Sequence, residues 1–375
     1  MGGLPGPGGH PGNHGTGHPL RTIYFHLTSE CNLACRHCWV APRLQRAATA
    51  SEFLSLPLLR SIVEQALPLG LASVKLTGGE PLLHPDFSGV LAVAREHDLG
   101  VAVETNGTLV MRDHAEALAT CRDPFVSVSL DGADADTHEW VRGVPGCFGA
   151  ACRGIGHLVD AGLRPQLIMS LFRRNADQVE ALVETAVAMG AGSVKFNIVQ
   201  PNARGARVHA DGEALTVAEV LRIGARVDNE LAPRSGVPLV FSTPPAFSPL
   251  GRLFGDGGCG CGRCGIRGVL GVLGDGSYAL CGIGETIPAL VFGHAARDRL
   301  EEVWRGHPVL EEIRAGLPRR LEGVCRACAM RGACLGGCLA QNVAQAGSLW
   351  GPYWFCSAAE EAGLFPQSRL LERRE

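Results

Sequence analysis

The sequence lacks several features that mark common classes of protein. No apolar run is long enough to span a bilayer, and no charged N-terminal region precedes the apolar stretch of a secretory signal. Basic residues are not clustered and the formal net charge is −3, so the composition indicates neither nucleic acid nor an anionic membrane surface as a partner. We therefore expect a cytoplasmic protein without a nucleic-acid or membrane partner.

Residues 1–20 carry too few apolar side chains to form a core. The segment Met1–Pro19 is mostly Gly, Pro and His, a composition typical of a disordered, solvated tail. Its histidines His10, His14 and His18 could bind a metal, but composition favours the tail.

Short β-rich runs alternate with amphipathic stretches through the first two thirds of the chain. Strands are expected at Thr22–Leu27, Ser73–Leu76, Val101–Glu104, Phe125–Leu130, Gln166–Leu171 and Ser193–Val199. Helices are expected at Leu58–Leu67, Phe87–His97, His114–Cys121, Gly149–Ala161 and Asp177–Met189. Six strand–helix repeats predict an α/β fold whose parallel sheet is open or closed into a barrel.

Ligands of such folds bind at the carboxyl ends of the strands, and unusual residues follow the predicted strands here. Three cysteines follow the first strand, and a Gly-Gly-Glu sequence follows the second. The later strands are followed by Thr105-Asn106-Gly107, Asp131-Gly132 and Gln200-Pro201.

The cysteines Cys31, Cys35 and Cys38 have the spacing CxxxCxxC. Three thiolates on one loop can hold three irons of a [4Fe–4S] cluster, and the fourth iron stays open because no fourth cysteine is near. A zinc site with a missing ligand is the alternative, although structural zinc prefers four ligands in paired spacing.

This motif, its place after the first strand and the following Trp39 resemble the radical S-adenosylmethionine (SAM) enzymes. The resemblance implies a partial (β/α)6 barrel over residues 21–245, an open iron that binds SAM, and cleavage of SAM to a 5′-deoxyadenosyl radical. Carried over residue by residue, the predicted SAM contacts are Gly78, Gly79, Glu80, Thr105, Asn106, Ser129, Asp131 and Arg142. A plain turn, a helix cap or a surface arginine would be the alternative for each.

The last third of the chain is rich in cysteine. A Pro/Gly-rich stretch, Thr243–Gly258, indicates a linker, and Gly268–Leu273 and Ser277–Leu280 indicate a hairpin. Nine cysteines then lie between Cys259 and Cys356. Paired zinc knuckles are one interpretation.

The spacing of these cysteines resembles the SPASM extension of peptide-modifying radical SAM enzymes, which would occupy residues 246–375. That resemblance implies two further [4Fe–4S] clusters, hence three in all. One would be held by Cys325, Cys328, Cys334 and Cys356, and the other by Cys264, Cys281, Cys338 and one of Cys259 and Cys261, of which Cys259 fits the usual spacing better.

Three more cysteines, Cys121, Cys147 and Cys152, have no place in these sets. Cys147 follows a barrel loop and is the candidate catalytic thiol, because a thiol across the pocket could return a hydrogen to a substrate radical. A small buried hydrophobic residue is the alternative, and it is favoured for all three.

The SPASM resemblance implies a peptide maturase. Gly282 stands where the sulfatase maturases carry an aspartate after the cysteine, which lowers that alternative, and the segments Cys281–Glu285 and Trp350–Cys356 look most like the SynChlorMet-cassette type. We expect oxidative crosslinking or thioether formation on a ribosomally made peptide; epimerisation, radical modification of a protein or small molecule, and a non-enzymatic iron–sulfur carrier stay open. Expected partners are a flavodoxin- or ferredoxin-type electron donor and a separate leader-peptide-binding protein.

Overall fold

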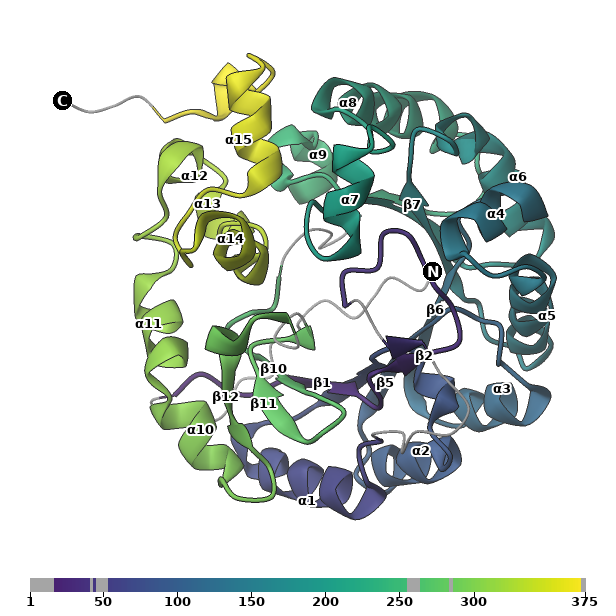
Figure 1. The fold of residues 1–375 in the computed structure, drawn as a ribbon, viewed down its shortest axis with the longest axis vertical. Coiled ribbons are helices and arrows are strands. Elements are labelled where there is room, and N and C mark those ends of the chain that lie inside the picture. Colours follow the sequence, from purple (N-terminus) through teal and green to yellow (C-terminus); the bar gives the residue numbers. More distant parts are fainter. Residues whose placement is uncertain (1–16, 41–42, 45–52, 255–263, 283–285, 372–375) are drawn as a thin grey trace.

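A single twisted sheet runs through the protein (Figure 1). The computed structural model describes residues 17–40, 43–44, 53–254, 264–282 and 286–371. Among these residues, ten strands form one sheet in the order β12-β11-β10-β1-β4-β5-β6-β7-β8-β9. The strands are β1 Thr22–His26, β4 Ser73–Thr77, β5 Gly100–Thr105, β6 Arg122–Ser129, β7 Gln166–Leu171, β8 Ser193–Ile198, β9 Leu239–Phe241, β10 Val269–Val272, β11 Ser277–Ala279 and β12 Val291–His294.

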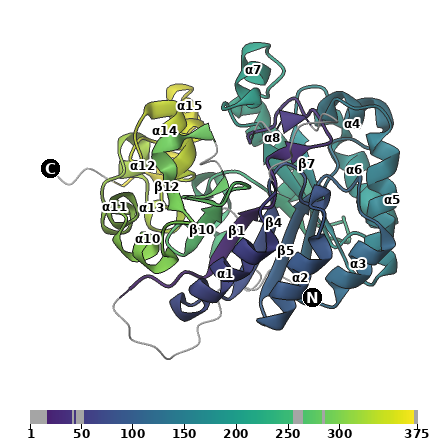
Figure 2. The same ribbon diagram turned by 60° about the horizontal axis from the view of Figure 1, so that its bottom comes forward.

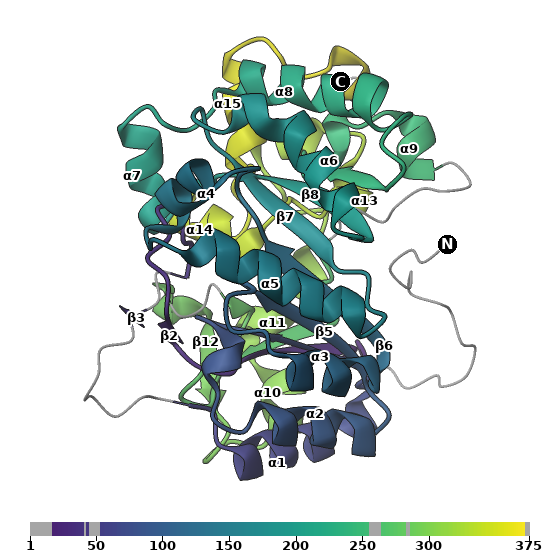
Figure 3. The same cartoon turned by 90° about the vertical axis from the view of Figure 1, so that its right-hand side faces the viewer.

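The strands from β1 to β9 pair in parallel, as the strand–helix repeats predict. Helices cross between them and cover the outer face of the sheet (Figure 3). These helices are α1 Leu56–Ala66, α2 Phe87–Glu96, α3 Arg112–Ala119, α4 Ala135–Arg142, α5 Cys147–Asp160, α6 Val179–Ala188 and α8 Val217–Arg226. The helix α7 Arg204–Ala210 lies apart from them, beside the cysteine loop, where the backbone N–H of Arg204 donates to the carbonyl of Cys38. On α1 the buried residues include Leu59, Ile62 and Val63, at the three- and four-residue spacing of one helix face.

The six predicted strands all form, with ends within three residues of the prediction. The largest difference is in β6, which begins at Arg122 although Pro124 lies within it. The β5–β6 register shifts between Gly100 and Ala102, and such an irregularity accommodates a proline that cannot donate to the ladder. The predicted α/β fold class is therefore confirmed.

The sheet extends beyond the six predicted strands at both ends. The short strand β9 pairs in parallel with β8, and β10 pairs in parallel with β1, Thr22 lying opposite Val269. The predicted hairpin forms from β10 and β11, which are antiparallel, and β12 joins β11. Figure 2 shows β10 lying beside β1, so the C-terminal part of the chain continues the sheet of the N-terminal part.

A group of short helices closes the other side of the molecule (Figure 1). They are α9 Leu250–Phe254, α10 Leu300–Gly306, α11 Pro308–Gly316, α12 Gly323–Ala327, α13 Arg331–Cys334, α14 Leu339–Ala346 and α15 Trp354–Glu361. Helix α10 packs against α1, and α15 packs against α8. One hydrophobic cluster includes Phe25 of β1, Trp304 of α10 and Phe355 of α15, so both parts share a core.

A second, smaller sheet lies in the loops that follow β1. It pairs the two-residue strands β2 Glu30–Cys31 and β3 Arg43–Leu44. Within the described ranges, no helix is long and apolar enough to cross a membrane.

Candidate active site

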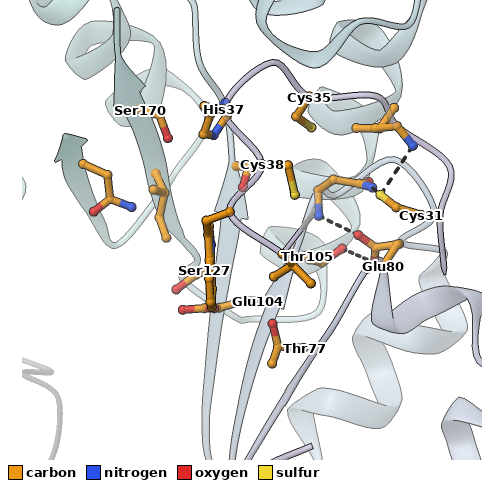
Figure 4. A pocket seen from close by; sticks show the side chains of 18 of the residues that line it. Cys31, Cys35, His37, Cys38, Thr77, Glu80, Glu104, Thr105, Ser127 and Ser170 are labelled. Carbon is orange, nitrogen blue, oxygen red and sulfur yellow. Dashed lines mark hydrogen bonds between the residues drawn. The ribbon is translucent and has the colours of Figure 1, made fainter. Parts of the chain in front are cut away.

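A cavity of about 380 Å³ lies at the carboxyl ends of the parallel strands. Figure 4 shows the side chains that face it, among them Glu80, Thr105, Ser127 and Ser170. Most of the site residues that the sequence predicts for this edge line the cavity: Cys31, Cys35, Cys38, Gly78, Gly79, Glu80, Thr105, Asn106, Ser129 and Arg142. The general rule for ligand sites in parallel sheets therefore locates this cavity.

The three cysteines lie on the loop after β1 and surround the cavity together (Figure 4). Cys31 and Cys35 are buried, and Cys38 is half-buried. Burial raises the pKa of Cys31 to about 12, although the backbone N–H of Leu33 donates to its Sγ at 3.4 Å. Without metal the thiol of Cys31 is therefore protonated, and metal binding must release its proton.

The arrangement of the triad can be compared with the needs of a zinc ion and of a cluster. In the part of the chain that the structure describes, no three His, Cys, Asp or Glu side chains converge closely enough to hold one metal ion. Thiolates on one tetrahedral zinc lie about 3.8 Å apart, because each Zn–S bond is about 2.3 Å. A cubane of four irons is wider than one ion, so cysteines that do not converge on one point are compatible with a cluster.

Gly78 and Gly79 allow the cysteine loop to pack against the end of β4. A Cβ on Gly78, whose φ is +127°, would lie 2.5 Å from the carbonyl oxygen of Thr28, and one on Gly79 would lie 1.8 Å from that of Glu30. The backbone N–H of Gly79 also donates to Thr28 O at 2.9 Å. The sequence predicts that these glycines let SAM approach the backbone closely. In the structure, a Cβ added at either glycine would instead meet the cysteine loop. Both line the cavity, and their contact with SAM stays a prediction.

Glu80 is a buried carboxylate with three hydrogen-bond donors. The hydroxyl of Thr105 donates to Oε1 at 2.6 Å, the backbone N–H of Asn106 donates to Oε2 at 2.8 Å, and the backbone N–H of Leu82 donates to Oε1 at 3.2 Å. Burial nevertheless raises the pKa of Glu80 to about 7, against the effect of these donors. A cation bound in the cavity would lower that pKa again and would in turn be held by the carboxylate.

Arg142 reaches the cavity from the last turn of α4 and is held by Asp131. Its Nε lies 2.6 Å from Oδ2 of Asp131, and the two side chains are 8% and 0% exposed. Burial alone would raise the pKa of Asp131, but attraction to Arg142 outweighs burial and lowers it. The backbone N–H of Ser170 donates to Asp131 at 2.7 Å, and Nη1 of Arg142 donates to Sγ of Cys35 at 3.5 Å. Asp131 does not line the cavity and holds Arg142 in place, and its own predicted contact with SAM stays a prediction.

Short polar side chains complete the wall of the cavity. Thr77, Ser127 and Ser129 face it from β4 and β6. The Nδ2 of Asn106 donates to Asn32 at 2.8 Å, which ties the end of β5 to the cysteine loop. Hydroxyl groups in this position suit the ribose and methionine parts of SAM.

Cys147 lies behind the triad. It is the first residue of α5, is buried, and packs with Cys31, Leu33 and Cys35 in one small cluster. Burial raises the pKa of its thiol to about 11. It does not line the cavity, so its predicted role as hydrogen donor gains no support from this position and stays a prediction.

The first C-terminal cysteine group lies around one small, largely apolar cavity with walls that include Leu321 and Phe365. Its members are the four predicted ligands of one cluster: Cys325, Cys328, Cys334 and Cys356. The thiols of Cys325 and Cys356 hydrogen-bond to each other, and the hydrogen bond from Cys356 lowers the pKa of Cys325. Four cysteines thus line one small apolar space, as ligands of a buried cluster would.

The second C-terminal cysteine group is described only in part. Cys264 and Cys338 line another cavity, of about 540 Å³, which lies between the sheet and the C-terminal helices. Cys281 comes two residues after the end of β11. Cys259 and Cys261 both lie outside the described residues, so the choice between them stays a prediction.

The cavity of about 380 Å³ and the cavity of about 540 Å³ share part of their walls. Lys75, Glu104, Ser127 and Ser242 line both the 380 Å³ cavity and the 540 Å³ cavity. The two cavities therefore adjoin, and together they extend from the triad to cysteines of the C-terminal part.

Comparison with known families agrees with this arrangement. The Radical SAM superfamily matches residues 25–186, and the SPASM iron–sulfur cluster-binding domain matches residues 261–329. The chain carries a radical SAM domain and a SPASM domain.

Similar proteins differ in what their names say they do. An AdoMet-dependent heme synthase of Nitratidesulfovibrio vulgaris is 31% identical over 53% of this chain, and the alignment spans 55% of that relative. A mycofactocin maturase of Mycobacterium ulcerans is 28% identical over 96% of this chain and 94% of its own. The structure of SuiB of Streptococcus suis with its precursor peptide SuiA has the same fold, with a TM-score of 0.68 at 18% identity, over 90% of this chain and 76% of SuiB. The SynChlorMet resemblance is not confirmed.

The residues of this radical SAM/SPASM enzyme fit the groups that its domains imply, SAM and iron–sulfur clusters. The triad, the buried Glu80 carboxylate and the Arg142 guanidinium surround one cavity. A ligand with an ammonium and a carboxylate would find a charge of opposite sign for each. The radical SAM match and the relative named a maturase support an enzyme rather than a non-enzymatic carrier.

Sequence reasoning missed several residues of the interior. Lys75 and Glu104 lie within or beside predicted strands, but only their alternation along β4 and β5 could have placed them on the inner face. His37 also lines the cavity and packs against Phe172, and burial lowers its pKa to about 4. A histidine between two motif cysteines gave no separate signal.

Proposed function

We propose that this enzyme cleaves SAM at the triad and oxidatively modifies a ribosomally made peptide, forming a crosslink or a thioether. The observation that supports this most is the shared wall of the two cavities, at Lys75, Glu104, Ser127 and Ser242. A substrate in this space would contact the triad side and the SPASM side at once. The relative named a mycofactocin maturase and the SuiB structure with its precursor peptide support a peptide as the substrate.

Three [4Fe–4S] clusters are part of the proposal. The triad would hold the first, the cysteines around the small apolar cavity the second, and Cys264, Cys281, Cys338 and Cys259 the third. With SAM bound, the first cluster supplies the 5′-deoxyadenosyl radical that removes a hydrogen atom from the substrate. We keep the division into a tail over 1–20, a barrel over 21–245 and a SPASM domain over 246–375 as part of the same proposal.

The chain's own residues would bind and orient SAM. Glu80 would accept from the SAM ammonium, and Arg142, held by Asp131, would meet its carboxylate. Thr105, Asn106 and Ser129 would contact the hydroxyl and methionine groups. The cysteine loop keeps its place through its contacts with Gly78 and Gly79, and these residues also lie against the SAM side of the cavity.

The electrons balance if the substrate loses two hydrogens. One electron from a flavodoxin- or ferredoxin-type donor cleaves SAM, and one hydrogen atom passes from the substrate to the 5′-deoxyadenosyl group. The new substrate bond would then form as the substrate gives up a proton and a second electron, and the C-terminal cysteine groups would hold a cluster able to take that electron. A separate leader-binding protein would present the peptide.

Modification of a small molecule is the second candidate. The relative from Nitratidesulfovibrio vulgaris is named a heme synthase. A cavity of about 540 Å³ lies within the usual range for small-molecule sites. Epimerisation is less well supported, because Cys147 does not line the 380 Å³ cavity.

The experiment is anaerobic reconstitution of the enzyme with iron and sulfide, followed by reduction in the presence of SAM. Formation of 5′-deoxyadenosine that disappears in a variant with the three triad cysteines changed to Ala supports the radical step. Incubation with short peptides encoded beside the gene then tests the substrate. If no such peptide is changed while a porphyrin or other small molecule is, the second candidate replaces the first.

A further inference from the structure

The chain contains only two lysines, Lys75 and Lys195, among its 34 lysine and arginine residues. Both line the 540 Å³ cavity between the sheet and the C-terminal helices. Every other position with a permanent positive side chain carries arginine. Lysine differs from arginine in presenting a compact ammonium on a flexible stem, so a specific use of that ammonium in the interior is a natural reason for these two exceptions.

The alternation of the strands turns both lysines inward. On β4, Ser73 and Lys75 face the cavity, and on β8, Ser193, Lys195 and Asn197 alternate with the buried Val194 and Phe196. Lys195 lines only the 540 Å³ cavity, whereas Asn197 lines the cavity of the triad. One inner-face step along β8, about 7 Å, therefore leads from Lys195 to the triad cavity.

Lys75 already has a partner. Its Nζ lies 2.5 Å from Oε1 of Glu104 and 4.7 Å from the centre of the Tyr24 ring. Burial alone would lower the pKa of Lys75, but Glu104 outweighs burial and raises it. The Cys281 side chain also acts on Lys75 electrostatically. Lys75 thus belongs to the polar layer beside the second C-terminal cysteine group.

Lys195 has no such partner. No hydrogen bond or ion pair joins it to another residue that the structure describes, and Glu104, which attracts it from a distance, is paired with Lys75. Burial lowers the pKa of Lys195, and repulsion from Lys75 adds to this. Apart from the cysteines, which would share the charge of a bound cluster, the charged side chains among the described residues of the cavity wall are Lys75, Lys195 and Glu104, and these three sum to +1.

An unpaired interior cation is unfavourable unless something compensates it. The side chain of Lys195 is half-buried and faces open space in the cavity. Neutral polar groups such as Ser127, Gln166 and Ser242 share this wall. The arrangement leaves room for one anionic group of a ligand beside the ammonium.

We propose that Lys195 binds a carboxylate of the substrate, either the C-terminal carboxylate of a peptide or an acidic side chain. The proposal rests on the proposed peptide-modifying function and deepens it. A carboxylate held at Lys195 places atoms about 7 Å further along β8 in the triad cavity. The modified carbon should therefore lie in the residue that carries this carboxylate or in its neighbour.

The first test uses a peptide that the wild-type enzyme modifies. It is prepared with a C-terminal acid or amide, and with each Asp or Glu changed in turn to Asn or Gln. Neutralising the bound carboxylate should raise KM about tenfold or more in the wild type, since a hydrogen bond to a charged group contributes about 1.5–3 kcal/mol. The same change should hardly affect KM in Lys195→Gln, and Lys195→Arg should restore part of the difference.

The peptide in which KM rises shows whether the bound carboxylate is the C-terminal one or that of an acidic side chain. Arg222→Gln, which removes an exposed charge on α8, is the matched control and should behave as the wild type. Equal KM increases in the wild type and in Lys195→Gln would overturn the proposal. Failure of the wild type to change any peptide would instead count against the proposed function.

The second test does not need a peptide product. Acetic anhydride labels amines, and two lysines make the result easy to read by mass spectrometry of the reconstituted enzyme. N-acetylglycine should slow acetylation of Lys195 as its concentration rises, and N-acetylglycinamide, which lacks the charge, should not. Lys75, paired with Glu104, serves as the internal reference. Equal acetylation of Lys195 with both probes would overturn the proposal even if no peptide substrate were known.

Discussion

Replacing Asp131 by Asn tests whether the buried ion pair with Arg142 organises the site. The pair is 2.6 Å long and its side chains are 8% and 0% exposed. Asn keeps the shape of the side chain but leaves the guanidinium of Arg142 buried without its counter-charge. Removal of one partner of a buried pair costs about 3–5 kcal/mol, so we expect Asp131→Asn to lower the free energy of unfolding by about that amount.

A double-mutant cycle separates the pair from its surroundings. Arg142→Gln should also destabilise the protein, but Asp131→Asn together with Arg142→Gln leaves no unpaired charge. The double variant should therefore be more stable than the sum of the single changes predicts, by about 1–3 kcal/mol.

Urea unfolding of the iron-free protein, followed by tryptophan fluorescence and circular dichroism, measures these differences. The comparison is valid where the variants unfold with equal dependence on urea. The exposed pair Arg60–Glu96, 2.7 Å long with side chains 37% and 53% exposed, is the control and should show no measurable coupling. Additive effects of Asp131→Asn and Arg142→Gln, or wild-type stability of either, would refute the reasoning.

Three further predictions concern the cofactors. The wild type should hold about twelve irons per chain, and changing the triad cysteines to Ala should leave about eight, as three cubanes require; full iron in that variant contradicts the triad assignment. Cys334→Ala should abolish peptide modification while some uncoupled cleavage of SAM persists, which assays of product and 5′-deoxyadenosine check separately. Glu80 should ionise as the pH rises through its pKa of about 7, so SAM affinity should increase about tenfold from pH 6 to pH 8. Equilibrium dialysis should show that this part of the pH dependence is absent in Glu80→Gln and present in Glu116→Gln, which changes an exposed residue of α3.

Much of the fold follows from local sequence patterns. The strand β7 has an apolar run at residues 167–169, and the structure reproduces the predicted Gln166–Leu171. The helix α4 was not predicted, because Ala135–Arg142 is mostly polar and its N-terminal signal, Asp134, also fits a turn. The pairing of β1 with β10 joins residues that are far apart in the sequence, and no local pattern encodes it.

In the site, too, local sequence signals were predictable and contacts between distant segments were not. Spacing identified the cysteine triad and the residues at the strand ends, because those signals are local. The position of Asp131 behind Arg142 depends on how β6, α4 and β7 pack. The sequence alone therefore could not distinguish a residue that contacts SAM from one that holds Arg142 in place. The isolation of Lys195 likewise depends on Glu104 and Lys75 pairing across two other strands.

The mass of the product tests the central proposal most directly. A neighbouring precursor peptide, incubated with the reconstituted and reduced enzyme in deuterated water, should lose two hydrogens, and 5′-deoxyadenosine should form with it. Fragmentation should place the change at the residue of the bound carboxylate or next to it. An unchanged bond pattern with one deuterium gained from solvent would contradict oxidative bond formation and would indicate epimerisation.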